Sequence, residues 1–214
     1  MRENYTRVNL NEWNRGNLFK SYIDNMRIVM SLTVDIDVTK LVTFIKNNNL
    51  NFYPSMIWIV SKVVNAHDEF KYGWDETGNL IKWNFISPSY VDFHNEDENF
   101  TKLVTTYSDN LFEFHNRFMA DKEKNKLERG FVKNQPLNFF DVSCLPWIKY
   151  KNFDIHVFDE GVFLAPVITW GKYEMEQQGR IIMPLSMNIH HAVADGFHLS
   201  RFFIEVQKLI DSLL

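Results

Sequence analysis

A short polar segment at residues 188–196 has the composition of a catalytic site. It reads Asn-Ile-His-His-Ala-Val-Ala-Asp-Gly, so His190 and His191 are adjacent and Asp195 follows four residues after the second histidine. A neutral imidazole has a pKa of about 6.5 and accepts a proton from a hydroxyl or a thiol near neutral pH. Because neighbours on an extended backbone face opposite ways, one of the two histidines is expected to point into the site. Asp195 has two possible roles, namely contact with the imidazole or an ion pair that braces the segment.

The elements on either side place this segment in a turn from a strand to a helix. Residues 181–189 alternate between apolar and other side chains, which predicts a strand. From Leu199 to Leu213, apolar residues recur at spacings of three and four, which predicts a helix with one apolar face. Gly196 permits a turn conformation that a β-carbon would resist. Rigid scaffolds often hold reactive groups in such turns, so a catalytic base is favoured over a histidine that only packs in the core.

The rest of the chain mixes helices and strands without internal repeats. The pattern predicts a strand at residues 29–37, a helix from Asp37 to the 47–49 run, a buried helix around 56–64 that starts near Pro54, a hairpin turn at 75–79, and a helix through 111–119. The charged stretch at 121–129 is either a solvated helix end or a loop. The order is not a regular alternation of strand and helix. We therefore predict a single α+β domain over residues 1–214, with a mixed β-sheet and helices packed largely on one face.

Composition excludes several classes of function. The chain has 214 residues, a formal charge of -4 and no basic tract, so a nucleic-acid partner is not expected. Its single cysteine, Cys144, lies in an apolar segment and is expected to be a small buried hydrophobe. The sequence contains no apolar run of about 18 residues, so a membrane span is not predicted. The charged first twenty residues do not resemble a signal peptide. We expect a soluble, cytoplasmic protein that makes no membrane contact.

The other histidines show no spacing typical of a metal site. None has acidic or cysteine partners at a ligand-like distance along the sequence, and the residues concerned are His67, His94, His115, His156 and His198. No metal is therefore predicted.

The His-His-x-x-x-Asp-Gly pattern resembles the active-site motif of the trimeric, acyl-CoA-dependent chloramphenicol acetyltransferases. It also occurs in acyltransferase domains of 2-oxo-acid dehydrogenase complexes and in peptide-synthetase condensation domains, so alone it indicates only acyl transfer. Further segments resemble the acetyltransferases in order and spacing, at residues 11–15 with Phe19 and Tyr22, 52–57, 93–100 (without the family's threonines), 142–147 and 165–173. The resemblance runs from about Trp13 to the C-terminus, leaves no room for lipoyl or carrier domains, and implies the fold of CoA-dependent acyltransferases.

The resemblance implies a role for each catalytic residue. His191 aligns with the general base that takes the proton of the acceptor hydroxyl, which then attacks the thioester of acetyl-CoA. Ser143 aligns with a hydroxyl that hydrogen-bonds the resulting oxyanion, and Thr169 with one that helps to hold it through an ordered water. Arg15 and Asp195 align with a buried ion pair that braces the histidine turn. Without the resemblance, Ser143 and Thr169 would be read as ordinary strand residues.

The resemblance also implies the binding residues and the assembly. Tyr22 aligns with an acceptor-binding residue and Phe100 with an apolar wall of the same pocket. Lys172 and Tyr173 align with contacts to coenzyme A, a cation for phosphate and a ring for the pantetheine arm, although Lys172 alone would be read as a surface charge. The family is homotrimeric, with sites at subunit interfaces. We therefore expect His191 from one subunit to meet Tyr22 from its neighbour.

One segment departs from the family pattern. Where the acetyltransferases carry Pro-Cys-x-(Tyr/Phe)-Ser, this chain has Arg-Ile-Val-Met-Ser at residues 27–31, so a flexible Met30 is expected in the wall of the acceptor pocket. The predicted function is acetyl-CoA-dependent O-acetylation of a small-molecule alcohol, first of all chloramphenicol. The alternatives are another alcohol, or a non-catalytic or regulatory homologue that binds a small apolar molecule. A binding module has no need of a general base, which argues against the last.

Overall fold

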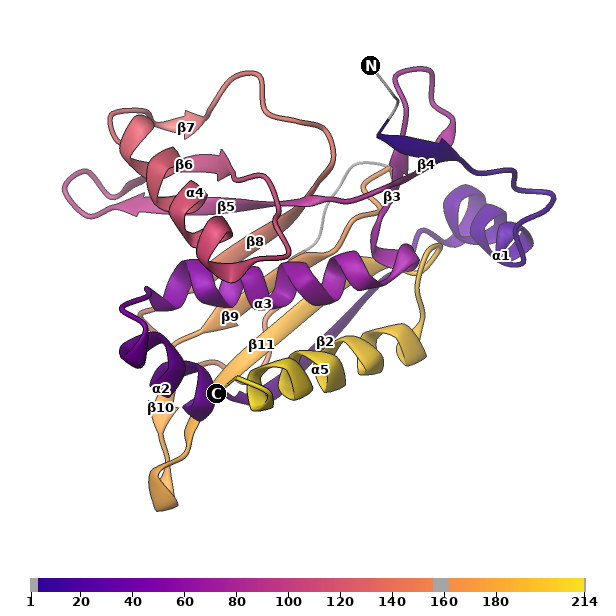
Figure 1. The fold of residues 1–214 in the computed structure, drawn as a ribbon. Coiled ribbons are helices and arrows are strands. Elements are labelled where there is room, and N and C mark those ends of the chain that lie inside the picture. The colour runs from indigo at the N-terminus through magenta and orange to yellow at the C-terminus, as the bar shows by residue number, and fades with distance from the viewer. Residues whose placement is uncertain (1–3, 156–161, 214) are drawn as a thin grey trace.

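The structure is a computed structural model that describes residues 4–155 and 162–213. Its centre is an eight-stranded sheet in the order β10-β11-β9-β8-β5-β6-β7, with β2 paired to β11 (Figure 1). The strands of this sheet are β2 (Val29–Asp37), β5 (Ser87–His94), β6 (Asn99–Val104), β7 (Gly130–Phe131), β8 (Phe139–Leu145), β9 (Val167–Gly171), β10 (Glu174–Met175) and β11 (Ile181–His190). The pairs β5/β8, β8/β9 and β6/β7 are parallel and the others are antiparallel, so the sheet is mixed, as predicted.

A smaller sheet and the helices complete the described part. The three-stranded sheet has the order β1-β4-β3 and consists of β1 (Tyr5–Arg7), β3 (Tyr72–Trp74) and β4 (Leu80–Trp83). The α-helices are α1 (Gly16–Ser21), α2 (Thr39–Asn47), α3 (Phe52–Ala66), α4 (Leu111–Lys124) and α5 (Gly196–Asp211). Shorter turns are π-helical at Tyr22–Met26 and 3-10 helical at Asp68–Phe70 and Gln177–Gly179. The β3–β4 hairpin lies where the 75–79 turn was predicted.

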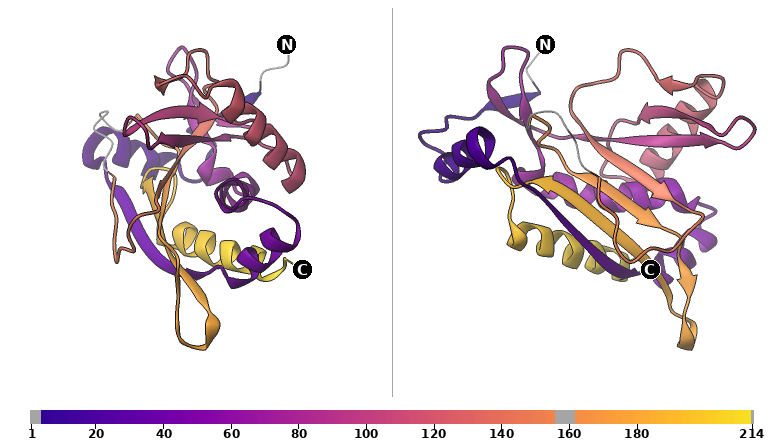
Figure 2. Two further views of the ribbon diagram at one scale, coloured as in Figure 1. Left: turned by 90° about the vertical axis from the view of Figure 1, so that its left-hand side faces the viewer. Right: turned by 180° about the vertical axis from the view of Figure 1, so that it is seen from behind.

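Four helices lie on one face of the larger sheet, which confirms the predicted arrangement. Figure 2 shows α2, α3, α4 and α5 together on one side of the strands, with α1 apart from them. The central helix α3 is apolar on most sides because it packs against the sheet and against α4 and α5. Met183, Leu185 and Met187 of β11 are fully buried against this layer. None of the described helices is long and apolar enough to cross a membrane.

Side-chain hydrogen bonds explain where the helices that follow β2 and β11 begin. The Asp37 carboxylate accepts a hydrogen bond from the Thr39 backbone N–H, 3.0 Å away, at the start of α2. The Asp195 carboxylate accepts one from the Phe197 N–H, also 3.0 Å away, and α5 therefore starts at Gly196, three residues before its first buried apolar residue. Strand β11 runs through His190. His191 is thus the first residue after the strand.

Candidate active site

The His191 ring is held in one tautomer by the turn in which it lies. Its backbone N–H donates to the Ile28 carbonyl at 2.8 Å, and its ring Nδ1 lies 2.8 Å from the Ala194 carbonyl oxygen. A carbonyl oxygen only accepts hydrogen bonds, so Nδ1 carries the hydrogen in the neutral ring and Nε2 has the lone pair. The side chain is half-buried. Nε2 is therefore the atom able to take a proton from an acceptor.

Arg15 braces this turn through four hydrogen bonds. Its Nε donates to the carbonyl of Ala192 at 2.8 Å, and its Nη2 donates to the carbonyls of His191 at 2.8 Å and Ala194 at 2.9 Å. Its Nη1 pairs with the Asp195 carboxylate at 3.1 Å. The expected ion pair is present, with Arg15 mostly buried and Asp195 half exposed. A planar guanidinium suits this task because its donors point to several oxygens at once.

Asp195 forms the ion pair that braces the histidine turn, which is the second of the two roles considered for it. Besides Arg15, its carboxylate contacts the Nδ1 of His198 at 2.9 Å, whereas the His191 ring bonds the Ala194 carbonyl instead. Burial alone would raise the pKa of Asp195, but the positive charge of His198 and the hydrogen bonds from Arg15 and the Phe197 N–H hold it below its usual value. The carboxylate thus stays ionised and anchors both Arg15 and the start of α5.

Tyr22 lies directly over the proposed base. Its ring stacks on the His191 ring of the same chain, with centroids 4.1 Å apart and planes at 26°. The expectation that Tyr22 meets His191 from a neighbouring subunit is therefore wrong. The π-helical turn at Tyr22–Met26 ends at Arg27, which has a left-handed φ of 46°, and this reversal carries the chain back along β11.

His190 is buried and its ring faces the turn backbone. It is 2% exposed, and its Nδ1 accepts a hydrogen bond from the Ala192 backbone N–H at 3.1 Å. The two adjacent histidines thus differ, since one supports the backbone and the other presents its ring beside Tyr22.

Ser143 and Thr169 lie far from His191 within one chain. Ser143 of β8 is in register with Thr169 of β9, and Thr169 with Ser186 of β11. His191 follows Ser186 by five residues, which corresponds to roughly 16 Å at about 3.3 Å per residue. The Thr169 Oγ1 is buried and has no hydrogen-bond partner among the described residues. One chain therefore holds two separate parts of the predicted site.

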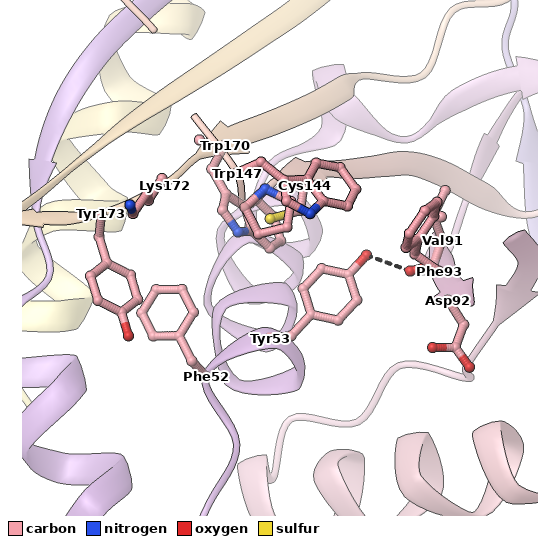
Figure 3. A pocket seen from close by; sticks show the side chains of 12 residues that line it. Phe52, Tyr53, Val91, Asp92, Phe93, Cys144, Trp147, Trp170, Lys172 and Tyr173 are labelled. Atoms are coloured by element: carbon pink, nitrogen blue, oxygen red, sulfur yellow. Dashed lines mark hydrogen bonds between the residues drawn. The ribbon is translucent and has the colours of Figure 1, made fainter. Parts of the chain in front are cut away.

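A cavity of about 670 Å³, the strand-end cavity, lies where the parallel strands β5, β8 and β9 end beside α3 (Figure 3). Half of its lining residues are aromatic, and the full lining consists of Phe52, Tyr53, Val91, Asp92, Phe93, Cys144, Pro146, Trp147, Trp170, Gly171, Lys172 and Tyr173. The predicted coenzyme residues Lys172 and Tyr173 are thus neighbours here, and both are exposed. The Tyr53 hydroxyl donates to the Val91 carbonyl at 3.0 Å and keeps its ring at the wall.

Cys144 belongs to the wall of the strand-end cavity. It is half-buried and packs against the core, and burial raises the pKa of its thiol to about 12. The thiol is therefore protonated at neutral pH and acts as a small apolar group.

A second cavity of about 410 Å³, the sheet-face cavity, lies on the sheet face opposite the helices. Its lining comprises Ser89, Val91, Phe100, Lys102, Phe131, Val132, Gln135, Pro136, Leu137, Phe139, Asp141, Ile155, Phe163 and Val167. Phe100, the predicted acceptor wall, lies here. Val91 lines both cavities, which places them side by side. An ion pair between Lys102 and Asp141 crosses this second cavity.

The place of Met30 in an acceptor pocket shared between chains stays a prediction. Met30 packs against the hydrophobic core on the same side of β2 as Leu32, and it lines neither cavity. The alternation of a strand explains this, because residues two apart share a face. The exposed apolar residues shortly before Met30 in the chain are Met26 and Ile28, which are 53% and 39% exposed.

Sequence reasoning missed most of the cavity lining. Trp147 and Phe52 were recognised only as parts of family-like segments, and Lys102 was not singled out. Two aromatic residues before a buried helix are a usable signal for Phe52 and Tyr53, whereas no local pattern places Lys102 opposite Asp141. The described residues contain no group of three side chains able to hold a metal ion. His156, one of the histidines considered, lies outside the described residues.

The chain is similar to known proteins over nearly its whole length. The family model described as chloramphenicol acetyltransferase matches residues 3–207. A chloramphenicol acetyltransferase of Clostridium butyricum is 36% identical over 208 residues, which is 96% of this chain and 94% of the relative. Chloramphenicol acetyltransferase 2 of Haemophilus influenzae is 34% identical over 216 residues, 99% of each chain.

Solved structures show the same fold. A chloramphenicol acetyltransferase superposes with a TM-score of 0.83 at 18% identity, covering 96% of this chain and 99% of the other. The dihydrolipoamide acetyltransferase of Azotobacter vinelandii superposes with a TM-score of 0.66 at 18% identity, covering 92% and 86%. The match of the family model and the relatives above 30% identity, each over nearly the whole chain, lead to one conclusion: the chain belongs to the chloramphenicol acetyltransferase family.

Proposed function

We propose that this protein transfers the acetyl group of acetyl-CoA to a hydroxyl of chloramphenicol, as one acyltransferase domain over residues 1–214. The observation that carries the proposal is the His191 ring, whose Nδ1 is fixed on the Ala194 carbonyl while Arg15 holds the turn by four hydrogen bonds. A base with one free nitrogen and a rigid support is suited to proton transfer. Such a base contributes about 10²–10⁴-fold to a rate.

The reaction follows from the groups present. His191 Nε2 takes the proton of the acceptor hydroxyl as its oxygen attacks the thioester carbonyl carbon. The Ser143 hydroxyl donates a hydrogen bond to the resulting oxyanion, and a donor of this kind is worth about 2.7–4 kcal/mol. The carbon–sulfur bond then breaks, and the proton passes from His191 to the sulfur of the departing coenzyme A. The Thr169 hydroxyl, buried without a partner among the described residues, is available to hold the intermediate through a water molecule.

Each co-substrate has a cavity that suits its chemistry. We assign acetyl-CoA to the strand-end cavity, because Lys172 offers a cation for phosphate and Tyr173 a ring for the pantetheine arm. The alcohol is assigned to the sheet-face cavity, whose apolar wall includes Phe100. Tyr22, stacked on His191, would orient the acceptor beside the base. Because Val91 borders both cavities, the two substrates would meet near Ser143 on β8.

The separation of Ser143 from His191 supports a shared site between copies of the chain. About 16 Å along the strand direction is too far for one acyl group to contact both residues, so His191 would reach the Ser143 of a second copy. The family resemblance implies a homotrimer with three such interfaces. In this assembly, Tyr22 accompanies His191, while the two cavities belong to the other chain. We place the protein in the cytoplasm, where its lone thiol would stay reduced.

A thiol-release assay with acetyl-CoA and chloramphenicol tests this function. The wild-type chain should release coenzyme A only when chloramphenicol is present, with the acetyl ester as the second product. His191→Ala should abolish turnover without loss of fold, whereas His190→Ala should retain more activity because the Nδ1 of His190 serves the Ala192 backbone N–H. Release of thiol without ester, or full turnover by His191→Ala, would contradict the proposal.

A further inference from the structure

The sheet-face cavity contains a partly buried ion pair within an otherwise mostly apolar wall. Lys102 lies on β6 and Asp141 on β8. The Nζ of Lys102 pairs with the Oδ1 of Asp141 across the intervening strand β5. The Lys102 side chain is 10% exposed and that of Asp141 33%. Phe100, Phe131 and Phe163 are among the apolar residues around them.

The pair lies on the side of the sheet where the acceptor is proposed to react. Asp141 precedes Ser143 by two residues on β8, so both side chains point to the same face, about 7 Å apart along the strand. Ser89 and Val91 of β5 lie between the two charged residues on that face. A molecule in the cavity with a hydroxyl near Ser143 would therefore contact the ion pair.

We propose that the Lys102–Asp141 pair selects acceptors that carry an uncharged polar group, such as a nitro group or a secondary amide, at the end buried in the sheet-face cavity. This inference rests on the proposed function and specifies its acceptor. The ammonium has three N–H donors, and one of them serves Asp141. A ligand acceptor atom would use another, and an amide N–H would use a free lone pair of the carboxylate.

The chemistry of the pair discriminates against two other kinds of alcohol. A wholly apolar ligand would remove water from both charged groups and return no hydrogen bond, which is unfavourable. A ligand with a net charge would meet a pair that is already neutral overall and would be desolvated without a counter-ion. The remaining class is a neutral alcohol with an aromatic body and a hydrogen-bonding substituent. Chloramphenicol has both a nitro group and a secondary amide.

The test is a double variant, Lys102→Met with Asp141→Asn, measured on three acceptors. These are chloramphenicol, its counterpart with hydrogen in place of the nitro group, and its counterpart with an N-methylated amide. A matched control is Lys71→Met with Asp68→Asn, a lysine–aspartate pair whose lysine is equally buried and which lines neither cavity. Acceptor KM, acetyl-CoA KM and melting temperature are recorded for each.

We expect the KM for chloramphenicol to rise about ten- to a hundredfold in the double variant, the range of one hydrogen bond to a charged group. One of the two counterparts lacks the polar group, nitro or amide N–H, that bonds to the pair. For that counterpart the KM of the double variant should stay within about twofold of the wild-type KM, and the acetyl-CoA KM should not change. Equal changes for all three acceptors would overturn the proposal and leave the pair as a link between strands. If the double variant does not fold, the same three acceptor KM values are measured for Asp141→Asn alone, and the same selective rise is expected.

Calorimetric binding of the three acceptors separates this proposal from the proposed function. If the wild-type chain binds the acceptors but transfers no acetyl group, the function fails while the selectivity of the pair is still measured. If it transfers acetyl groups and the double variant shows no selective loss of affinity, only the present inference fails.

Discussion

Replacement of Arg15 by methionine should damage both stability and catalysis. Methionine keeps much of the length of the side chain but removes all four hydrogen bonds to the histidine turn. The carbonyls of the buried Ala192 and Ala194 then lose a charged donor. The Asp195 carboxylate loses its guanidinium partner and keeps the Phe197 N–H and His198.

The magnitude follows from the burial of these groups. Loss of one partner of a buried ion pair costs about 3–5 kcal/mol, and the half exposure of Asp195 favours the lower end. At about 2–4 °C per kcal/mol for a chain of this size, the melting temperature should fall by roughly 10 °C. A shift of the His191 ring by about 1 Å would lower kcat by about 10²-fold, because proton transfer depends on position.

Calorimetry and a steady-state assay of Arg15→Met, with Arg15→Lys as the matched variant, check this estimate. Lysine keeps the charge but lacks the planar fork that reaches four oxygens, so it should recover less than half of the lost melting temperature. If Arg15→Lys restored both the melting temperature and kcat to the wild-type values, charge alone would be sufficient. The planar fork of hydrogen-bond donors would then have no role in holding the turn.

Three further predictions concern single groups. Ser143→Ala should lower kcat by about 10²–10³-fold with an unchanged KM for acetyl-CoA, and a pure KM effect would exclude the oxyanion role. Thr169→Val should leave the melting temperature unchanged or higher, because the buried hydroxyl has no partner among the described residues, while kcat falls; an unchanged kcat would remove Thr169 from the site. The pKa of Asp195 is lowered in the fold, so its stabilising contribution is present above the unfolded value of about 4 and is lost as the pH falls through the lower folded value. Melting curves between pH 7 and pH 2 should therefore converge for wild type and Asp195→Asn at the acid end, and a constant difference would contradict this reasoning.

The elements with a clear period were predictable from the sequence. The alternation at residues 29–37 and 181–189 became β2 and β11, and the spacing after Leu199 became α5. The predicted turn between β11 and α5 does hold His191. These features depend on local order along the chain, which a periodic pattern records.

Features that depend on distant contacts were not predictable in this way. The π-helical turn at Tyr22–Met26 has no 3.6-residue signature, so the stack of Tyr22 on His191 in one chain was unexpected. Met30 was assigned to a pocket from its place in a motif, and that motif did not reveal its partial burial against the core of its own chain. The meeting of Lys102 with Asp141 requires three strands in the correct order, which no segment of the sequence specifies alone.

Mixed assemblies of two inactive chains show whether His191 of one copy acts with Ser143 of another. His191→Ala and Ser143→Ala chains are unfolded together, refolded at equal concentration and assayed for acetyl transfer, with co-assembly verified by distinct affinity tags. A site is intact only where its His191 comes from a Ser143→Ala chain and its Ser143 comes from a His191→Ala chain. At equal concentration each condition holds for about half of the interfaces, so about a quarter of the sites should be intact. A Tyr22→Ala chain mixed with His191→Ala should recover nothing, since both changes damage the same half. Activity near a quarter of the wild-type value in the first mixture is the predicted result, and no recovery from verified mixed assemblies would contradict the shared site.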